Sequence, residues 1–133
     1  MSKRVSTRSF DELEKERYFY HGVVLEVYDG DSITIELDLG LNISVSVKLR
    51  LADIDAPELR GKERPQGLVT RDRLREMILN SDVFVKTIKD RKGKYGRLIA
   101  TVWAEDEVGV YYNVNDFLVK SGLAKPYLGR KKS

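Results

Sequence analysis

Residues 43–51 alternate strictly between apolar and polar side chains, and this pattern most narrows the choice of fold. Its apolar members are Ile43, Val45, Val47, Leu49 and Leu51. Because side chains point to alternate faces of a strand, these residues share one face, which we expect to be buried. A second alternating segment, residues 32–37, follows the turn-forming run Asp29-Gly30-Asp31, and residues 18–28 before the turn are rich in β-branched and aromatic side chains. We therefore predict three antiparallel strands in succession.

The second half of the chain predicts two helices and two more strands. Residues 53–67 contain two prolines and a charged run, which together predict a long surface loop. Pro65 suits the first turn of a helix ending near residue 80. Strands are expected at residues 83–88 and 98–104. A last helix is expected at residues 114–121, before Gly122.

This order of elements predicts a mainly β protein with helices, in the α+β class. Five strands interrupted by a helix after the third are typical of a five-stranded Greek-key barrel of the OB type, with two or three packed helices. We assign residues 18–128 to this domain, residues 1–17 to an N-terminal extension, and residues 129–133 to a basic C-terminal tail. Phe10, Leu13 and Tyr18 are expected to cover part of the domain. We expect a monomer.

Composition excludes several classes of function. The chain has no cysteine and a single histidine, His21, so disulfides, iron–sulfur clusters, zinc sites and serine–histidine triads have almost no residues to use. No apolar run approaches the roughly 20 residues that a membrane-spanning helix needs. Residues 1–17 are polar, with no apolar stretch typical of a secretory signal, which predicts a cytoplasmic protein and leaves secretion after removal of a leader open.

Acidic residues gather around the ends of the predicted strands. Asp31 follows the first turn, and Asp53, Asp55 and Glu58 crowd the end of the third strand. Carboxylates and backbone carbonyls are the ligands of Ca²⁺ and Mg²⁺, so the cluster favours a hard cation over zinc. Ordinary turn and loop chemistry also accounts for these residues.

Two arginines complete a set of residues suited to phosphate chemistry. Arg50 has the opposite parity to Leu49 and Leu51, so it points away from the apolar face. Arg97 directly precedes the strand predicted at residues 98–104, after a basic turn at residues 92–96. Arginine matches phosphate oxygens with its planar fork. With a catalytic glutamate and two metal-type aspartates, these arginines supply what hydrolysis of a phosphodiester demands.

Taken together, four motifs resemble those of the staphylococcal nuclease (thermonuclease) family in order and approximate spacing. They are Asp29-Gly30-Asp31-Ser32, Arg50-Leu51-x-x-Ile54-Asp55-Ala56-Pro57-Glu58, Lys94-Tyr95-Gly96-Arg97 and Leu118-Val119-x-x-Gly122-Leu123-Ala124. The resemblance covers roughly residues 23–127, and several separated motifs in order are much more specific than any one of them.

The resemblance implies a calcium-dependent endonuclease that acts on DNA and RNA. The resemblance further implies cleavage of the bond to the 5′ oxygen, which leaves 3′-phosphate ends. By motif match, Asp31, Asp55 and the carbonyl of Ala56 are calcium ligands, and Glu58 is the general base. Arg50 and Arg97 match the arginines that stabilise the transition state. Lys94, Tyr95 and, by a looser match, Tyr127 match residues that contact the substrate.

Two other functions stay open from the sequence. A catalytically inactive domain of the same fold would use its barrel to bind nucleic acid or protein. An ordinary OB-type binder of single strands would expose aromatic side chains on a sheet face as stacking platforms. Candidates for such platforms are Tyr18, Phe19, Tyr20, Tyr111 and Tyr112. Because all of the acidic and arginine positions are intact, we favour the enzyme.

Overall fold

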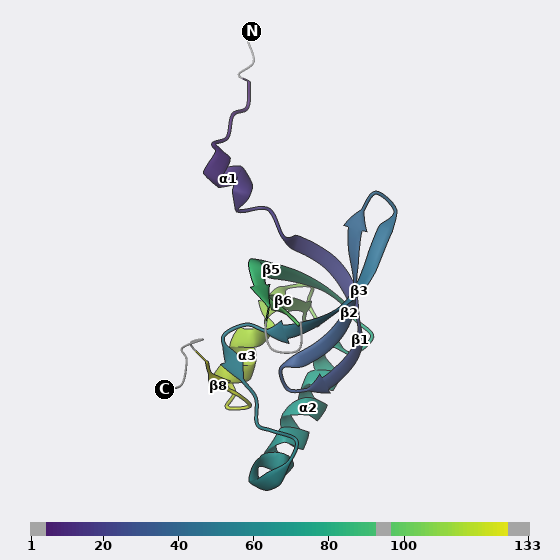
Figure 1. The fold of residues 1–133 in the computed structure, drawn as a ribbon, viewed down its shortest axis with the longest axis vertical. Helices are drawn as coiled ribbons and strands as arrows, with labels where there is room; N and C mark the ends of the chain where they lie inside the picture. The colour runs from purple at the N-terminus through teal and green to yellow at the C-terminus, as the bar shows by residue number, and fades with distance from the viewer. Residues whose placement is uncertain (1–4, 93–96, 128–133) are drawn as a thin grey trace.

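A closed β-barrel is the centre of the fold in the computed structural model, which describes residues 5–92 and 97–127 (Figure 1). The barrel strands are β1 (Phe19–Asp29), β2 (Ser32–Gly40), β3 (Ile43–Leu51), β5 (Asp82–Lys92) and β6 (Leu98–Glu105). They form one sheet in the order β3-β2-β1-β5-β6, and a parallel pairing of β3 with β6 closes it. This topology confirms the predicted five-stranded OB-type barrel.

The core fills the barrel because each of the five strands turns one row of apolar residues inward. Val24 of β1, Ile35 of β2, Leu49 of β3, Val85 of β5 and Val102 of β6 have no exposed surface. The alternation that predicted the strands therefore separates the inner face from the outer face, as burial of apolar area requires.

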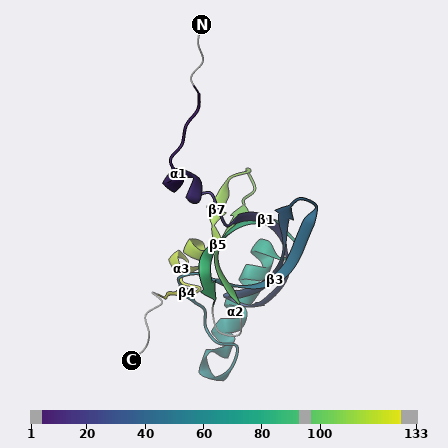
Figure 2. The ribbon, with the colours of Figure 1, turned by 45° about the horizontal axis from the view of Figure 1, so that its top comes forward.

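Two helices pack on the barrel and contribute to the core. Helix α2 (Arg64–Ile78) has Pro65 in its first turn, and it buries Leu74 and Ile78. Helix α3 (Val114–Lys120) is capped by the side chain of Asn113 and buries Leu118. Figure 2 shows the strands curving into the barrel, with α2 behind its opening. Within the described ranges, no helix is both long and apolar enough to cross a bilayer.

The predicted loop at residues 53–67 contains ordered structure that the sequence analysis missed. Strand β4 (Ile54–Asp55) pairs with β8 (Lys125–Pro126), and η1 (Gly61–Glu63) precedes α2. The prediction of a surface loop is wrong at Ile54, which is only 2% exposed. A further strand, β7 (Tyr111–Asn113), extends the sheet beside β6.

Two predictions about burial are also wrong. The N-terminal extension contains α1 (Phe10–Glu14), which buries no residue, and Phe10 is 74% exposed, so this helix does not cover the domain. In β3, the shared apolar face is buried only at its end, at Leu49 and Leu51. Ile43 is exposed because the β2–β3 hairpin is longer than the barrel and projects beyond it (Figure 1).

Candidate active site

The buried carboxylate of Asp31 is the centre of the candidate site. Asp31 lies in the turn between β1 and β2, and its carbonyl accepts a hydrogen bond of 2.9 Å from Leu51 N–H. Its Oδ2 accepts from Ala56 N–H at 3.0 Å, and its Oδ1 accepts from the Ser32 hydroxyl at 3.3 Å. The turn and the segment that follows β3 are therefore joined through one aspartate.

Arg50 places a positive charge beside this carboxylate. Its Nη2 lies 3.4 Å from Asp31 Oδ2 and 3.6 Å from Asp55 Oδ1. Its Nη1 donates to the carbonyls of Leu51 at 3.2 Å and Ile54 at 3.0 Å. The guanidinium is thus fixed by backbone on one side and faces both acids on the other, as its rigid fork of donors allows.

Ser32 connects the second arginine to the same group. Arg97 Nη1 donates to the Ser32 hydroxyl, and this hydroxyl donates to Asp31. Ser32 also lies directly opposite Arg50 in the pairing of β2 with β3. The structure therefore brings together four predicted site residues from separate segments, which are Asp31, Arg50, Asp55 and Arg97.

The residues around Asp31 fit a calcium ion. Asp31 and Asp55 each place a carboxylate oxygen within 3.6 Å of Arg50 Nη2, and the hydrogen bond from Ala56 N–H holds the Ala56 peptide beside Asp31. Among the described residues, no three acidic, histidine or cysteine side chains gather as a metal cluster. Backbone oxygen, water and a phosphate oxygen would have to complete the coordination, which Ca²⁺ accepts readily.

A third carboxylate, Asp29, lies next to Asp31. Its Oδ1 accepts from Asp31 N–H at 3.0 Å. Burial, followed by the neighbouring charge of Asp31, raises the pKa of Asp29 to about 6. The turn therefore concentrates negative charge in a partly buried place, which favours a bound cation.

Glu58 lies apart from this group. It is exposed, and its N–H donates to Glu63 Oε1 at 2.8 Å. Its carboxylate makes no hydrogen bond or ion pair with another described residue. Helix α2 fixes its backbone, because a Cβ at Gly67 would lie 2.3 Å from the Glu58 carbonyl oxygen. The structure thus positions the chain at Glu58 without joining its side chain to Asp31.

This contact predicts the effect of Gly67→Ala. In a helix interior, alanine usually stabilises by about 1 kcal/mol over glycine. Here the added methyl group requires the backbone at Glu58 to move, so we expect the free energy of unfolding to fall by about 1–3 kcal/mol. Urea denaturation followed by circular dichroism measures it. Val69→Ala, at an exposed position of the same helix, is the control and is expected to stay within about 0.5 kcal/mol. A stability gain in Gly67→Ala would contradict the contact.

The predicted substrate contacts fall partly outside the described residues. Lys94 and Tyr95 lie outside them. Tyr127 reaches the site, because its N–H donates to the Asp53 carbonyl at 2.8 Å and its ring lies 5.4 Å from the Arg50 guanidinium carbon. The pairing of β4 with β8 carries Tyr127 to this place.

Sequence reasoning missed three contributors to the site. In the sequence, Ser32 stands out only as part of a motif, and turn chemistry accounts for Asp29. Gly30 was also assigned to turn chemistry, yet a Cβ there would lie 2.5 Å from Thr70 Cγ2 and 2.6 Å from Ala56 Cβ. Close packing of the turn against α2 explains Gly30. Only Ser32 had a signal in the sequence, its place beside Asp31.

Comparisons with known proteins identify relatives of this chain. The chain matches thermonucleases of Staphylococcus intermedius, at 32% identity over 106 residues, and Staphylococcus hyicus, at 30% over 105 residues. Each match covers 77% of this chain, but only 57% and 56% of the respective relative. Among solved structures, the extended Tudor domain of human TDRD1 with a symmetrically dimethylated peptide shares 14% identity at a TM-score of 0.43, over 79% of this chain and 57% of that chain.

The family profile described as "Staphylococcal nuclease homologue" matches residues 48–133, which include Arg50, Asp55, Glu58 and Arg97. The profile match over more than half of the chain, together with two curated relatives at 32% and 30% identity, shows the family. This chain belongs to the staphylococcal nuclease homologues.

Proposed function

We propose that this domain is a calcium-dependent endonuclease that hydrolyses phosphodiester bonds of DNA and RNA. The observation that carries the proposal is the convergence of Asp31, Asp55 and Arg50, with Arg97 joined to them through Ser32. Family membership supports the same chemistry.

The two arginines would bind the phosphate. Arg50 is fixed by the carbonyls of Leu51 and Ile54, so its remaining N–H groups are oriented before substrate arrives. Arg97 directly precedes β6 and reaches the Ser32 hydroxyl. Preorganised donors of this kind stabilise negative charge as it develops at phosphorus, at no cost of reorganisation.

Glu58 would take a proton from the attacking water. The water oxygen forms a bond to phosphorus, the bond from phosphorus to the 5′ oxygen breaks, and the 5′ oxygen takes a proton from solvent. The product ends are a 3′ phosphate and a 5′ hydroxyl. The loop carrying Glu58 must bring its carboxylate toward the arginines, since the side chain is exposed.

Asp31, Asp55 and the carbonyl of Ala56 would hold calcium. The ion, when bound, supplies positive charge to a phosphate oxygen and orients water. Tyr127, over the Arg50 guanidinium, would limit the motion of that side chain and face the nucleotide.

Cleavage of single-stranded DNA and of RNA by the purified protein tests the proposal. We expect cleavage with Ca²⁺, none with EDTA, and products that carry 3′ phosphates. Glu58→Gln keeps the size of the side chain and removes the base, so we expect turnover to fall by about 10²–10⁴. Glu76→Gln, an exposed glutamate of α2, is the matched control.

No cleavage by a folded protein in any divalent ion would overturn the enzyme. Binding of nucleic acid by that inactive protein would then support the binding module instead. Equal activity of Glu58→Gln and the parent protein would overturn the role of Glu58 alone.

A further inference from the structure

A cluster of aromatic rings on the outer face of the barrel has no part in the candidate site. Its members, here called the aromatic plate, are Phe19, His21, Phe84, Trp103 and Tyr111. The Phe19 and Phe84 rings stack at 5.6 Å with an interplanar angle of 4°. Trp103 lies 5.9 Å from Phe19, and His21 and Tyr111 lie 5.2 and 5.4 Å from Phe84.

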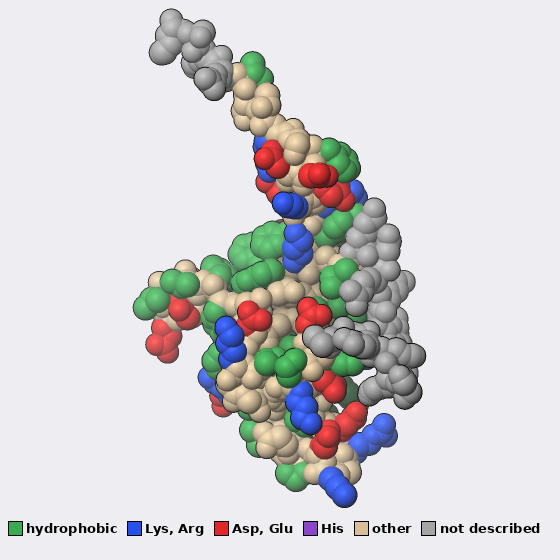
Figure 3. All heavy atoms as spheres, turned by 90° about the vertical axis from the view of Figure 1, so that its left-hand side faces the viewer, with side chains coloured by type: hydrophobic (Ala, Val, Ile, Leu, Met, Phe, Trp, Pro, Cys, Tyr) green, Lys and Arg blue, Asp and Glu red, His purple; other side chains and the backbone are tan. Residues whose placement is uncertain are grey.

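Sheet register sets the positions of these rings. His21 pairs with Phe84 across β1 and β5, and Phe84 pairs with Trp103 across β5 and β6. Val83 and Val85, on either side of Phe84, have no exposed surface, so the Phe84 ring lies on the outer face of the barrel. Figure 3 shows hydrophobic side chains gathered on the barrel next to the N-terminal extension. The plate is therefore an ordered surface of a kind that is typical of a binding face.

The ring faces of the plate are not covered by arginines of the described part of the chain. Phe19 is 48% exposed and Tyr111 is 42% exposed. Three arginines lie over aromatic rings within the described ranges, Arg17, Arg50 and Arg73, and the rings that they cover are outside the plate. An aromatic ring presents a negative face, so the exposed rings of the plate can take a cation from a partner.

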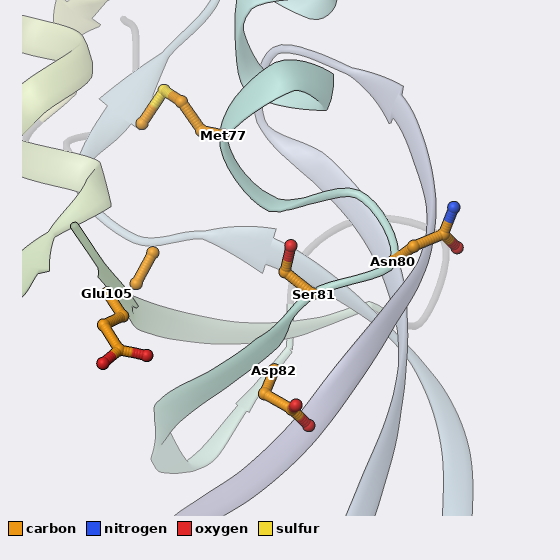
Figure 4. Close-up of a pocket in the computed structure, with 6 residues that line it drawn as sticks. Met77, Asn80, Ser81, Asp82 and Glu105 are labelled. Carbon is orange, nitrogen blue, oxygen red and sulfur yellow. The ribbon is translucent and has the colours of Figure 1, made fainter. Parts of the chain in front are cut away.

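Carboxylates border the plate. Asp38 lies opposite His21 in the pairing of β1 with β2, and Asp82 Oδ1 lies 3.3 Å from His21 Nε2. Asp82 and Glu105 line a hollow of about 300 Å³, and their carboxylates point away from Met77 (Figure 4). Asp38, Asp82 and Glu105 are all exposed. A partner that covers the rings therefore meets negative charge at the edge of the plate.

The described lysines and arginines do not neutralise this border. Within residues 5–92 and 97–127, no lysine or arginine forms an ion pair with Asp38, Asp82 or Glu105. Lys86 follows the buried Val85 and so shares the outer face, but its ammonium group donates to the Lys15 carbonyl. The whole chain has a formal net charge of +3, so the negative face is a local feature of a basic protein.

Tyr111 brings this negative charge to the rings. It lies opposite Glu105 in the pairing of β6 with β7, and its ring contacts Phe84 edge to face. Desolvation, followed by the charge of Glu105 and then that of Asp82, raises the pKa of Tyr111. A positive group seated on the plate is therefore stabilised by the carboxylates as well as by the ring faces.

We propose that the aromatic plate binds an arginine-bearing peptide segment of a partner protein. A guanidinium group is planar, stacks on an aromatic face and donates N–H groups to carboxylates, so it matches both features of the plate at once. It would stack on the exposed rings and donate to Asp82 and Glu105. The same acids repel the phosphates of a nucleic acid strand, so Phe19 and Tyr111 would contact protein rather than stack on bases. This binding is separate from the proposed nuclease activity.

Fluorescence anisotropy of a labelled peptide of alternating glycine and arginine, titrated with the full chain, tests the proposal. We expect saturable binding that weakens as the salt concentration rises. The same peptide with lysine in place of arginine should bind more weakly, because an ammonium group cannot stack as a plane. No binding of the arginine peptide, or equal binding of a glutamate peptide, would overturn the proposal.

Two pairs of variants locate the binding on the plate. Phe19→Ser removes an exposed ring, and we expect the affinity for the arginine peptide to fall at least about tenfold. Leu41→Ser, at a residue 89% exposed on the β2–β3 hairpin, is its control and should bind as the parent protein does. Circular dichroism checks that both variants fold. Equal affinities of the two variants would place the peptide elsewhere and overturn the proposal.

Glu105→Gln keeps the size of the side chain and removes its charge, so it tests the acidic border without changing the rings. We expect the affinity for the arginine peptide to fall about two- to fivefold, as for the loss of an exposed ion pair. Glu26→Gln, at an exposed glutamate of β1 outside the plate, is the matched control. Equal affinities of these two variants would overturn the part of Glu105 in the site, whether or not Phe19→Ser folds.

Trp103 gives an independent readout, because it is the single tryptophan of the chain and belongs to the plate. Its emission should change as the arginine peptide saturates the protein, and this change should be absent in Phe19→Ser. A change caused by single-stranded DNA in EDTA, and not by the peptide, would assign the plate to nucleic acid and overturn the proposal. A shift that follows protein concentration alone would show a second copy on the plate and overturn it as well.

Discussion

Replacing Arg50 with alanine is expected to lower kcat by about 10²–10³, the loss typical of one preorganised donor to a developing negative charge. Arg50 faces Asp31 and Asp55 with one nitrogen and is fixed by the carbonyls of Leu51 and Ile54 through the other. The substitution removes the positive charge and leaves the buried carboxylate of Asp31 without its ion pair. Single-turnover cleavage at saturating Ca²⁺ measures the effect on chemistry, separately from product release.

Arg50→Lys separates charge from geometry. A lysine keeps the charge, but it cannot donate to two carbonyls while facing two carboxylates, so we expect only partial recovery of kcat. Arg73→Ala removes one positive charge from the exposed face of α2 and serves as the control. Full activity of Arg50→Lys would show that charge alone suffices, and full activity of Arg50→Ala would contradict its role.

The largest loss of stability is expected at Asn115, which is buried where α3 meets the closure of the barrel. Its Oδ1 accepts from Val102 N–H at 3.1 Å, and its Nδ2 donates to the carbonyls of Ala52 at 3.0 Å and Ala100 at 3.2 Å. Asn115→Ala leaves a buried donor and acceptor unpaired, at about 1–3 kcal/mol each. We expect the free energy of unfolding to fall by about 2–5 kcal/mol in urea denaturation, a large part of a typical domain's stability.

Asn115→Asp tests the direction of these hydrogen bonds. The side chain keeps its size but turns an oxygen toward two carbonyl oxygens, so we expect a loss at least as large as in the alanine variant. Asn113→Ala is the control, since this residue caps α3 from the surface and its loss should cost about 1 kcal/mol. Equal losses at Asn113 and Asn115 would contradict the buried network.

Features that depend on a residue and its neighbours in the sequence could be predicted from the sequence. Alternation located the strands, because burial selects one face of a strand regardless of its partners. Pro65 and Gly122 located the helix boundaries, because their backbone preferences act locally. Arg50 was predicted to point away from the apolar face by parity alone, and the structure places it among Asp31 and Asp55.

Features that depend on contacts between distant segments could not be predicted. β4 has two residues, and it forms only because β8 supplies a partner about seventy positions later. Glycine is required at position 30 only because α2 and Ala56 pack against the turn and leave no space for a side chain. The row formed by His21, Phe84 and Trp103 is likewise not predictable from the sequence, since the register of β1, β5 and β6 alone brings these residues side by side.

The parallel pairing of β3 with β6 also has a consequence for the order of folding. It joins Leu49 to Leu98 and Leu51 to Ala100, segments about fifty residues apart, so the entropy of closing that loop opposes it until other contacts compensate. The hairpins of β1 with β2 and β2 with β3 need no such closure and can form earlier. Arg50 lies in β3, and Arg97 directly precedes β6, so the two arginines come from opposite sides of this pairing. A chain that has formed these hairpins but has not yet paired β3 with β6 therefore does not hold Arg50 and Arg97 near each other. We expect the capacity to bind phosphate to appear only when this pairing forms, late in refolding.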